Sequence, residues 1–308
     1  MVLRGLLAAC LALVLTGCGA GSGGGGTEKE SAEGPGAGKP PVTLATKNFT
    51  EQFVLGQLYK QALEAKGFTV RLKEDVGSSE LVDRALTHHS IDLYPEYVGV
   101  IVTEIAHEGA RQRSPADTYR RAKAFEAGRG FVLLAPTPGY DALANAVKPA
   151  YARTHGLRRT SDLRKLSAFR YGGPPENRTR MQGSAGLRAV YGVRHFTDVP
   201  LEGAQRYTAL DHGDVDVTQV FSTEGQLVER TRYRVLEDDK GLYGFQNIAP
   251  VVDRKVLRRQ GPAFRQTLDA VDATLTNRAL QQMNGAVDLR GEAPADVARR
   301  FIDAHHLV

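Results

Sequence analysis

The fold is predicted by a nonapeptide that occurs twice, as ALTHHSIDL at residues 85–93 and as ALDHGDVDV at residues 209–217. Both copies read Ala-Leu-x-His-x-x-[Ile/Val]-Asp-[Leu/Val], the pattern of a helix end, a turn and a buried strand. Carrying the same spacing forward places Tyr97 opposite Phe221. A unit this short can also recur by chance. If it is a repeat, each half carries an aromatic residue just past an equivalent strand end, where open α/β sheets bind ligands.

Strands and helices alternate on both sides of the two copies. The predicted strands are 42–46, 68–72, 91–94, 169–172 and 215–221, and the predicted helices are 50–66, 78–88, 185–191, 204–212, 263–275 and 295–305. We expect Asn48 or Thr50 to cap the first helix. Helices of this length between strands indicate βαβ units, and therefore an α/β fold with parallel sheets.

The composition is that of a folded protein with more than one domain. The chain has 308 residues, of which 42% are hydrophobic and 24% are charged. This content excludes long disorder as the main state, and the length suits two domains. The formal net charge is only +5, and the basic residues form no long run. Together with the export signal described next, this argues against nucleic acid as a partner.

The N-terminus has the features of an export signal. An apolar run at 6–15 is too short to span a bilayer and matches a signal-peptide core. It ends in LTGC at 15–18, which resembles a bacterial lipobox. We therefore expect a signal peptide at 1–17, a lipid on Cys18 and a Gly-rich flexible tether at 18–41. The alternative is an unprocessed apolar tail. The mature protein is expected to be extracytoplasmic and lipid-anchored to the bacterial cell membrane.

The sequence lacks the motifs of common enzyme classes. It contains no Gly-x-Ser-x-Gly, no P-loop and no His-Glu-x-x-His. The two cysteines, Cys10 and Cys18, both lie before the predicted folded part. Adjacent histidines such as those at 88–89 do not share a helix face, so they are poor metal chelates. We therefore predict a binding protein with no catalytic residues, no cofactor and no metal.

Eight further motifs identify a family resemblance. They are KNFTEQF at 47–53, GSSE at 77–80, IDLYPEY at 91–97, APTPGYD at 135–141, GPPE at 173–176, VFSTEG at 220–225, EDDKG at 237–241 and PVV at 250–252. Together they closely resemble the substrate-binding lipoproteins of osmoprotectant ABC transporters, which bind quaternary ammonium compounds such as glycine betaine, choline and carnitine. The resemblance covers essentially all of residues 42–308.

The resemblance implies a two-lobed, type II periplasmic-binding-protein fold. Each lobe is then a mostly parallel sheet flanked by helices, and hinge closure traps the ligand in the cleft between them. We expect lobe 1 at 42–143 plus 248–308 and lobe 2 at 144–247. The implied partners are a small quaternary-ammonium ligand, an ABC permease and its ATPase. Two alternatives are a receptor for an amino acid or other small cation, and a secreted hydrolase on the same scaffold.

The resemblance also implies ligand-binding residues. Aromatic faces hold a quaternary ammonium group, and the expected cage is Tyr97, Tyr140 and Phe221. The family's fourth aromatic falls near 243–246, and the most direct register places Gln246 there.

Polar ligand contacts are expected beside this cage. By resemblance, Lys47 and Arg180 would meet a ligand carboxylate. The remaining residues of the expected set are Asn48, Asp141 and Ser222.

One departure from the family pattern concerns the ligand. Many relatives read Tyr-Thr-Gly-Thr where this chain reads Tyr97-Val98-Gly99-Val100. The missing hydroxyl at Val100 weakens the case for glycine betaine. Glu80 and Asp141 could instead meet a hydroxyl or a second cation. The sequence therefore predicts a quaternary-ammonium or related cationic solute and leaves its identity open.

Overall fold

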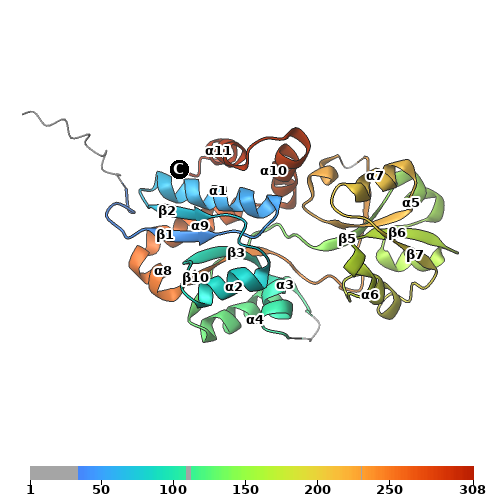
Figure 1. Cartoon of the computed structure of the whole chain (residues 1–308), viewed down its shortest axis with the longest axis horizontal. Helices are drawn as coiled ribbons and strands as arrows, with labels where there is room; N and C mark the ends of the chain where they lie inside the picture. Colours follow the sequence, from blue (N-terminus) through green and yellow to red (C-terminus); the bar gives the residue numbers. More distant parts are fainter. Residues whose placement is uncertain (1–33, 109–111, 230) are drawn as a thin grey trace, which may run out of the picture. The chain divides into compact units, whose positions relative to one another are not determined.

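The computed structural model describes residues 34–108, 112–229 and 231–308 (Figure 1). The predicted signal peptide at 1–17 and lipidation at Cys18 lie outside the described residues. The end of the predicted tether does not match the expectation, because the chain at 34–41 packs on the folded body. The Gly36 N–H donates to the Lys66 carbonyl at 2.9 Å, and Gln260 Nε2 donates to the Pro40 carbonyl at 2.8 Å.

The first sheet is mixed, with the strand order β2-β1-β3-β10-β4. Its strands are β1 Val42–Ala45, β2 Val70–Lys73, β3 Leu93–Tyr97, β4 Phe131–Leu133 and β10 Ile248–Asp253. Strand β1 pairs in parallel with β2 and β3, whereas β10 runs antiparallel between β3 and β4. This sheet therefore needs a strand from the distant C-terminal part of the chain.

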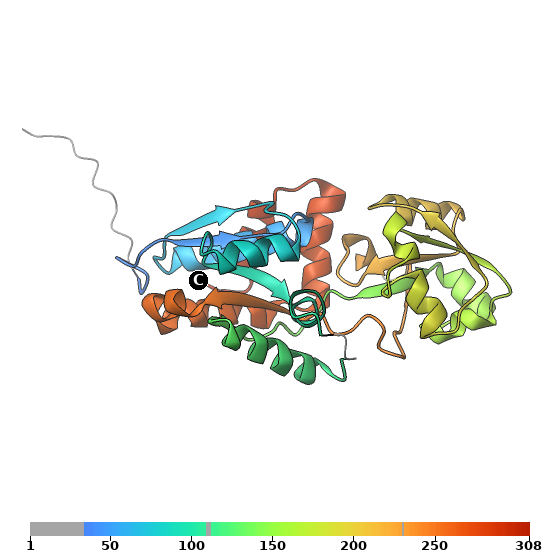
Figure 2. The same cartoon turned by 60° about the horizontal axis from the view of Figure 1, so that its bottom comes forward.

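The second sheet repeats this arrangement in the order β7-β6-β8-β5-β9. Its strands are β5 Leu143–Val147, β6 Phe169–Gly173, β7 Phe196–Pro200, β8 Val217–Phe221 and β9 Arg234–Leu236. Strand β6 is parallel to β7 and β8, and β5 runs antiparallel between β8 and β9. The chain crosses between the sheets after β4 and again after β9 (Figure 2). The predicted two-lobed α/β fold is confirmed, but the expectation of mostly parallel sheets is wrong, because two of the four strand pairings in each sheet are antiparallel.

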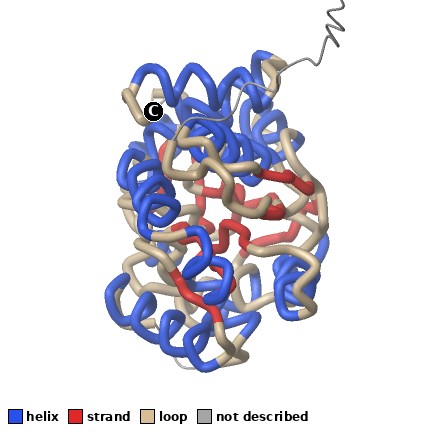
Figure 3. Tube along the Cα trace, turned by 90° about the vertical axis from the view of Figure 1, so that its left-hand side faces the viewer, coloured by secondary structure: helices blue, strands red, loops and turns tan. Residues whose placement is uncertain are grey.

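Helices flank the strands of both sheets (Figure 3). Those in the part of the chain that forms the first sheet are α1 Thr50–Ala65, α2 Ser79–Thr87, α3 Val98–Val100, α4 Pro115–Gly128, α8 Arg254–Gln260, α9 Pro262–Thr274, α10 Asn277–Arg290 and α11 Pro294–Ala304. Those of the second sheet are α5 Pro149–His155, α6 Ser184–Ala189 and α7 Gln205–His212. Buried apolar clusters form the cores.

The repeated nonapeptide has the same structural role in both sheets. In each copy the aspartate lies just before the central strand and bonds twice to the neighbouring parallel strand. Asp92 accepts the Thr43 N–H at 2.7 Å, and Asp216 accepts the Arg170 N–H at 2.8 Å. Their own N–H groups donate back to the carbonyls of the same two residues. The strands begin later than predicted, at Leu93 and Val217, because the preceding residues serve this side-chain bond.

The start of α1 differs from the prediction. Its N-cap residue is Phe49, in an extended conformation with φ −149° and ψ 161°, and no side chain caps the helix. Neither Asn48 nor Thr50 has the predicted role. The Thr50 hydroxyl instead donates to the carboxylate of Asp288 at 2.6 Å. Phe49 therefore lies at the N-terminus of α1, where the residue is 38% exposed.

Helix α10 of the first lobe contacts the second lobe through two glycines. The 3-10 turn η4 (Gly225–Val228) lies against α10, and a Cβ atom on Gly225 would be 2.4 Å from Gly285 Cα. Nearby, Gln281 Nε2 donates to the Ser222 carbonyl and Asn284 Nδ2 to the Thr223 carbonyl, at 2.8 and 2.9 Å. This contact fixes the backbone that follows β8.

Replacing Gly225 with alanine tests the close contact. We expect Gly225→Ala to lower the free energy of unfolding by about 1–3 kcal/mol, because the new methyl group overlaps backbone atoms of α10. The control is Gly128→Ala at the end of α4, where an added Cβ meets nothing within 4 Å. That change is expected to be neutral or to stabilise by up to about 1 kcal/mol. Calorimetric melting that moves both variants equally would contradict the close contact.

Candidate ligand-binding site

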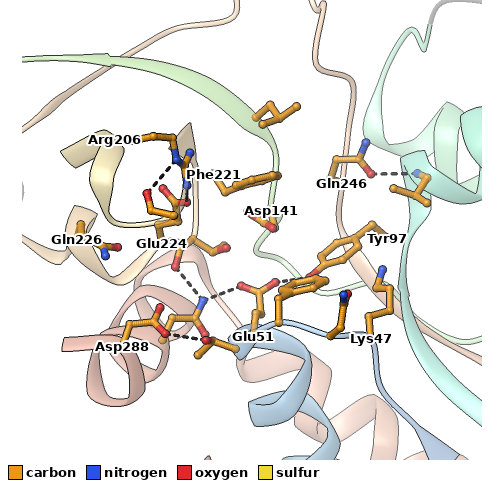
Figure 4. Close-up of a pocket in the computed structure, with 18 of the residues that line it drawn as sticks. Lys47, Glu51, Tyr97, Asp141, Arg206, Phe221, Glu224, Gln226, Gln246 and Asp288 are labelled. Carbon is orange, nitrogen blue, oxygen red and sulfur yellow. Dashed lines mark hydrogen bonds and ion pairs between the residues drawn. The ribbon is translucent and has the colours of Figure 1, made fainter. Parts of the chain in front are cut away.

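A cavity of about 720 Å³ is lined by residues from both lobes. Tyr97 and Phe221, the last residues of β3 and β8, both line it. Around them lie residues of α1, of the turns that open α2 and α7, of the two crossovers and of α10. The two aromatic positions matched by the sequence repeat therefore face one cavity (Figure 4).

The exposed aromatic surface of the cavity comes from both sides. Phe221 is 40% exposed and Phe49 is 38% exposed, whereas Tyr97 is only 5% exposed. The rings of Phe49 and Tyr97 are stacked with centroids 6.2 Å apart. Sequence reasoning missed Phe49 as a site residue because it reads as part of a turn. Its signal is a large apolar side chain at a helix start, next to a lysine.

Lys47 lies in the cavity wall, but its charge is already paired. Its ammonium group forms a buried ion pair with Glu96 and lies 3.2 Å from Ser79 Oγ. The same ammonium group sits 4.1 Å from the centroid of the Tyr97 ring. Burial lowers the pKa of Lys47, and the Glu96 carboxylate opposes that shift. The sequence predicted a carboxylate-binding lysine, but protein groups already surround this ammonium.

Two carboxyl groups, one buried (Glu51) and one half-buried (Asp141), face the cavity with no ion-pair partner within the described part of the chain. Glu51, in the first turn of α1, accepts the Tyr97 hydroxyl at 2.8 Å and Asn284 Nδ2 at 2.9 Å. Asp141, in the first crossover, has a buried Oδ1 with no hydrogen-bond partner among those residues. Burial raises the pKa of Glu51. Burial and then the charge of Glu51 raise the pKa of Asp141 well above its usual range.

A second cation in the cavity wall is also paired. Arg206 forms an ion pair with Glu224 and donates to the Gln219 carbonyl at 2.6 Å. Glu224 also accepts the Tyr207 hydroxyl. Sequence analysis missed this cluster because Arg206 reads as an ordinary helix residue. The VFSTEG motif contains Glu224, so that motif carried the only available signal.

The fourth wall of the predicted cage is formed by Gln246. Its Oε1 accepts the Val100 N–H at 3.1 Å, and its amide packs on Gly99. Tyr243 also borders the cavity, but it is only 2% exposed and its hydroxyl accepts from Asn145. Gln246 therefore gives this wall a polar amide and no aromatic face.

Asn48 lines the cavity, but three other predicted site residues do not. Tyr140 is 46% exposed, and its carbonyl accepts the hydroxyl of Ser222 at 2.8 Å. Because neighbours on an extended segment point to opposite sides, Asp141 faces the cavity and Tyr140 does not. Arg180 borders a smaller adjoining cavity of about 240 Å³, which also contains Phe221. Ligand roles for these three residues stay predictions.

Residues 34–108, 112–229 and 231–308 contain neither a metal cluster nor a membrane-spanning helix. Within those ranges, no group of three or more His, Cys, Asp and Glu side chains is placed to hold a metal ion. Over the same ranges, no helix is both long and apolar enough to cross a membrane.

The buried pair of Lys47 and Glu96 can be tested by removing one charge. We expect Glu96→Gln to cost about 3–5 kcal/mol of stability, because it leaves a buried ammonium without its counter-charge. The matched control is Glu64→Gln, whose exposed i,i+4 pair with Lys60 should contribute less than about 1 kcal/mol. Thermal melts should also show partial recovery when Lys47→Met is added to Glu96→Gln. Equal losses in the two single variants would contradict the role assigned to the pair.

Comparisons with known proteins identify the family of the chain. A family model for the substrate binding domain of the ABC-type glycine betaine transport system matches residues 40–304. A glycine-betaine-binding protein of Pseudomonas aeruginosa is 31% identical over 275 residues, covering 85% of this chain and 87% of that protein. A glycine betaine-binding protein of Escherichia coli is 26% identical, covering 85% of this chain and 90% of its own.

Solved structures show the same fold. A structure of a glycine betaine/carnitine/choline ABC transporter superimposes with a TM-score of 0.79 and 24% identity, covering 86% of this chain and 99% of its own. The matched region spans both sheets, both crossovers and every residue named above as lining the cavity. The chain belongs to the family of substrate-binding domains of ABC-type glycine betaine transport systems.

Proposed function

We propose that this protein captures a small quaternary-ammonium osmoprotectant outside the cytoplasmic membrane and delivers it to an ABC permease. It performs no chemistry itself, and the ATPase of the transporter supplies the energy. The observation that carries the proposal is the cavity, which combines exposed aromatic faces with carboxyl groups that have no cationic partner within the described residues. The relatives named for glycine betaine support the same ligand class.

The chemistry of the ligand explains this combination. A trimethylammonium group has no N–H to donate, so it is held by aromatic faces and by nearby negative charge. Each aromatic face contributes about 0.5–2 kcal/mol. Phe49 and Phe221 are the most exposed rings in the cavity, and they come from opposite lobes. The carboxyl groups of Glu51 and Asp141 lie in the same cavity.

The two crossovers are the proposed hinge. The Asp141 N–H donates to the Gln246 carbonyl at 3.0 Å, and Tyr140 pairs with Asn247 in an antiparallel bridge. Because Asp141 and Gln246 also line the cavity, bending at the crossovers would move ligand contacts and lobes together. Closure over the ligand would then form the surface on which the permease docks.

Attachment to the membrane is proposed from the N-terminal motif. Lipidation of Cys18 would keep the receptor beside its permease, since lipid chains contribute about 0.8 kcal/mol per buried CH₂ group.

Substituting Cys18 tests this attachment. In the bacterium, Cys18→Ser should move the protein from the membrane fraction to the soluble extracytoplasmic fraction, while the washed protein keeps its ligand affinity. Cys10→Ser is the matched control and should stay membrane-bound, because Cys10 lies inside the predicted signal peptide. An unchanged distribution of Cys18→Ser would refute the anchor.

Calorimetric titration tests the ligand class. Choline, glycine betaine and carnitine are titrated into the mature protein, and we expect saturable binding of at least one of them. Phe221→Leu and Phe49→Leu keep the apolar volume but remove the aromatic face. Each should weaken binding by about five- to thirtyfold, the equivalent of roughly 1–2 kcal/mol.

The control for these variants is the same substitution outside the cavity. Phe301→Leu in α11 removes a ring that stacks on His305 and does not line the cavity. It should leave affinity unchanged. No binding of any of the three compounds would overturn the ligand class. Equal losses in all three variants would show that the aromatic faces of the cavity are not the binding surface.

A further inference from the structure

The cavity contains two carboxyl groups whose charges no buried cation balances, and this determines which ligand charge it accepts. We propose that Glu51 and Asp141 share one proton in the empty cavity and thereby sense the charge of the ligand. A cation without a carboxylate binds with release of that proton to the solvent. A zwitterion whose carboxylate reaches the pair needs the proton to stay. This inference rests on the proposed function and deepens it.

The geometry brings the two groups together from different parts of the chain. Glu51 belongs to α1 and is 3% exposed, and Asp141 belongs to the first crossover. Figure 4 shows the Asp141 side chain below the ring of Phe221, and Glu51 further below, next to the Tyr97 hydroxyl. Asn284 Nδ2, which donates to Glu51, also donates to the carbonyl of Thr223 just after β8, at 2.9 Å in both cases. The pair thus joins both lobes and the hinge.

The cations that face the pair are already neutralised. Lys47, before α1, is paired with Glu96 of β3. Arg206 of α7 is paired with Glu224, the acid that follows β8. Within the described residues, these two ion pairs cancel and leave the charges of Glu51 and Asp141 unbalanced.

The other groups around the pair do not supply a positive charge. Tyr97 of β3 and Asn284 of α10 are neutral donors to Glu51. Asp288 of α10 adds a third carboxylate, which is exposed and bonded to the Thr50 hydroxyl. Two carboxylates that share a buried site cannot both ionise without a large penalty, so one of them retains a proton.

The pKa shifts agree with this arrangement. Burial raises the pKa of Glu51, although hydrogen bonds from Thr223, Tyr97 and Asn284 and the charge of Lys47 oppose the shift. Burial, then Glu51, raises the pKa of Asp141 well above its usual range, and Glu224 adds to this shift while Thr223 opposes it. A ligand cation would lower both pKa values and so favour loss of the proton.

The two types of ligand place opposite demands on the pair. Choline carries a hydroxyl that can donate to Asp141 Oδ1, the atom without a partner among the described residues. Glycine betaine carries a carboxylate, which only accepts hydrogen bonds and is repelled by an ionised pair. It can approach the pair only when a protonated carboxyl group donates to it. The cavity wall at position 100 is an apolar valine side chain. It has no hydroxyl that could donate to the ligand carboxylate in place of the protonated carboxyl group.

The sign of the pH dependence follows from linkage. Below the raised pKa of the pair, choline must displace a proton, so its Kd should rise by up to about tenfold for each unit that the pH falls. Above that pKa its Kd should be constant. Glycine betaine should show the opposite trend, because its affinity falls as the pair loses its proton.

The test is calorimetric titration of the mature protein with choline and with glycine betaine between about pH 5 and pH 9. Buffers of different ionisation enthalpy report the proton exchanged. We expect choline to release up to one proton and the affinity ratio of choline to glycine betaine to rise with pH. Binding of choline with no proton exchange, or equal pH slopes for the two ligands, would overturn the inference. Failure of choline, glycine betaine and carnitine alike to bind would instead overturn the proposed function.

A pair of variants locates the proton. Asp141→Asn should abolish proton release on choline binding and flatten the pH dependence. Asp296→Asn alters an exposed carboxylate of α11 that does not line the cavity and should keep both. Unchanged proton release in Asp141→Asn would refute the assignment. If Asp141→Asn does not fold, as judged by its melting transition, the titration of the unaltered protein with both ligands still tests whether choline binding releases a proton.

Discussion

The first sheet is completed by a strand that returns to it after the whole second sheet has formed, and the rest of the structure depends on this constraint. Strand β10 lies between β3 and β4, whereas the second sheet is built from the continuous segment β5–β9. The chain therefore leaves the first sheet by one crossover and returns to it by the other. The residues at the crossovers, Asp141 and Gln246, are thereby held at the carboxyl ends of β3 and β8 and become part of the cavity wall. The same two residues therefore belong to the crossovers, to the proposed hinge and to the cavity wall.

The charges of the cavity follow a simple division. The ammonium of Lys47 and the guanidinium of Arg206 are tied to protein carboxylates, so they shape the wall without offering free positive charge. Glu51 and Asp141 have no such partner within the described residues. A bound ligand cation would supply the positive charge that balances these two carboxyl groups. The exposed faces of Phe49 and Phe221 suit the same cation, because an aromatic face attracts positive charge without a hydrogen bond.

Much of this was predictable because it depends on local pattern. The nonapeptide repeat identified the equivalent strands and placed Tyr97 and Phe221 at their ends. The roles of Lys47 and Arg206 were not predictable, because their partners are remote: Glu96 is far along the chain from Lys47, and Glu224 follows a different element from Arg206. Phe49 was missed because its exposure depends on an uncapped helix start. Tyr140 faces away from the cavity because extended neighbours alternate, which the motif alone does not reveal.

The central claim is that the cavity holds a quaternary ammonium group between aromatic faces from the two lobes. A crystal structure of the mature protein grown with saturating choline tests it most directly. The account predicts the trimethylammonium group against Phe221 and the Phe49–Tyr97 stack, with the hydroxyl directed at Asp141. Choline bound elsewhere, or a cavity that stays empty under saturating conditions, would contradict the account.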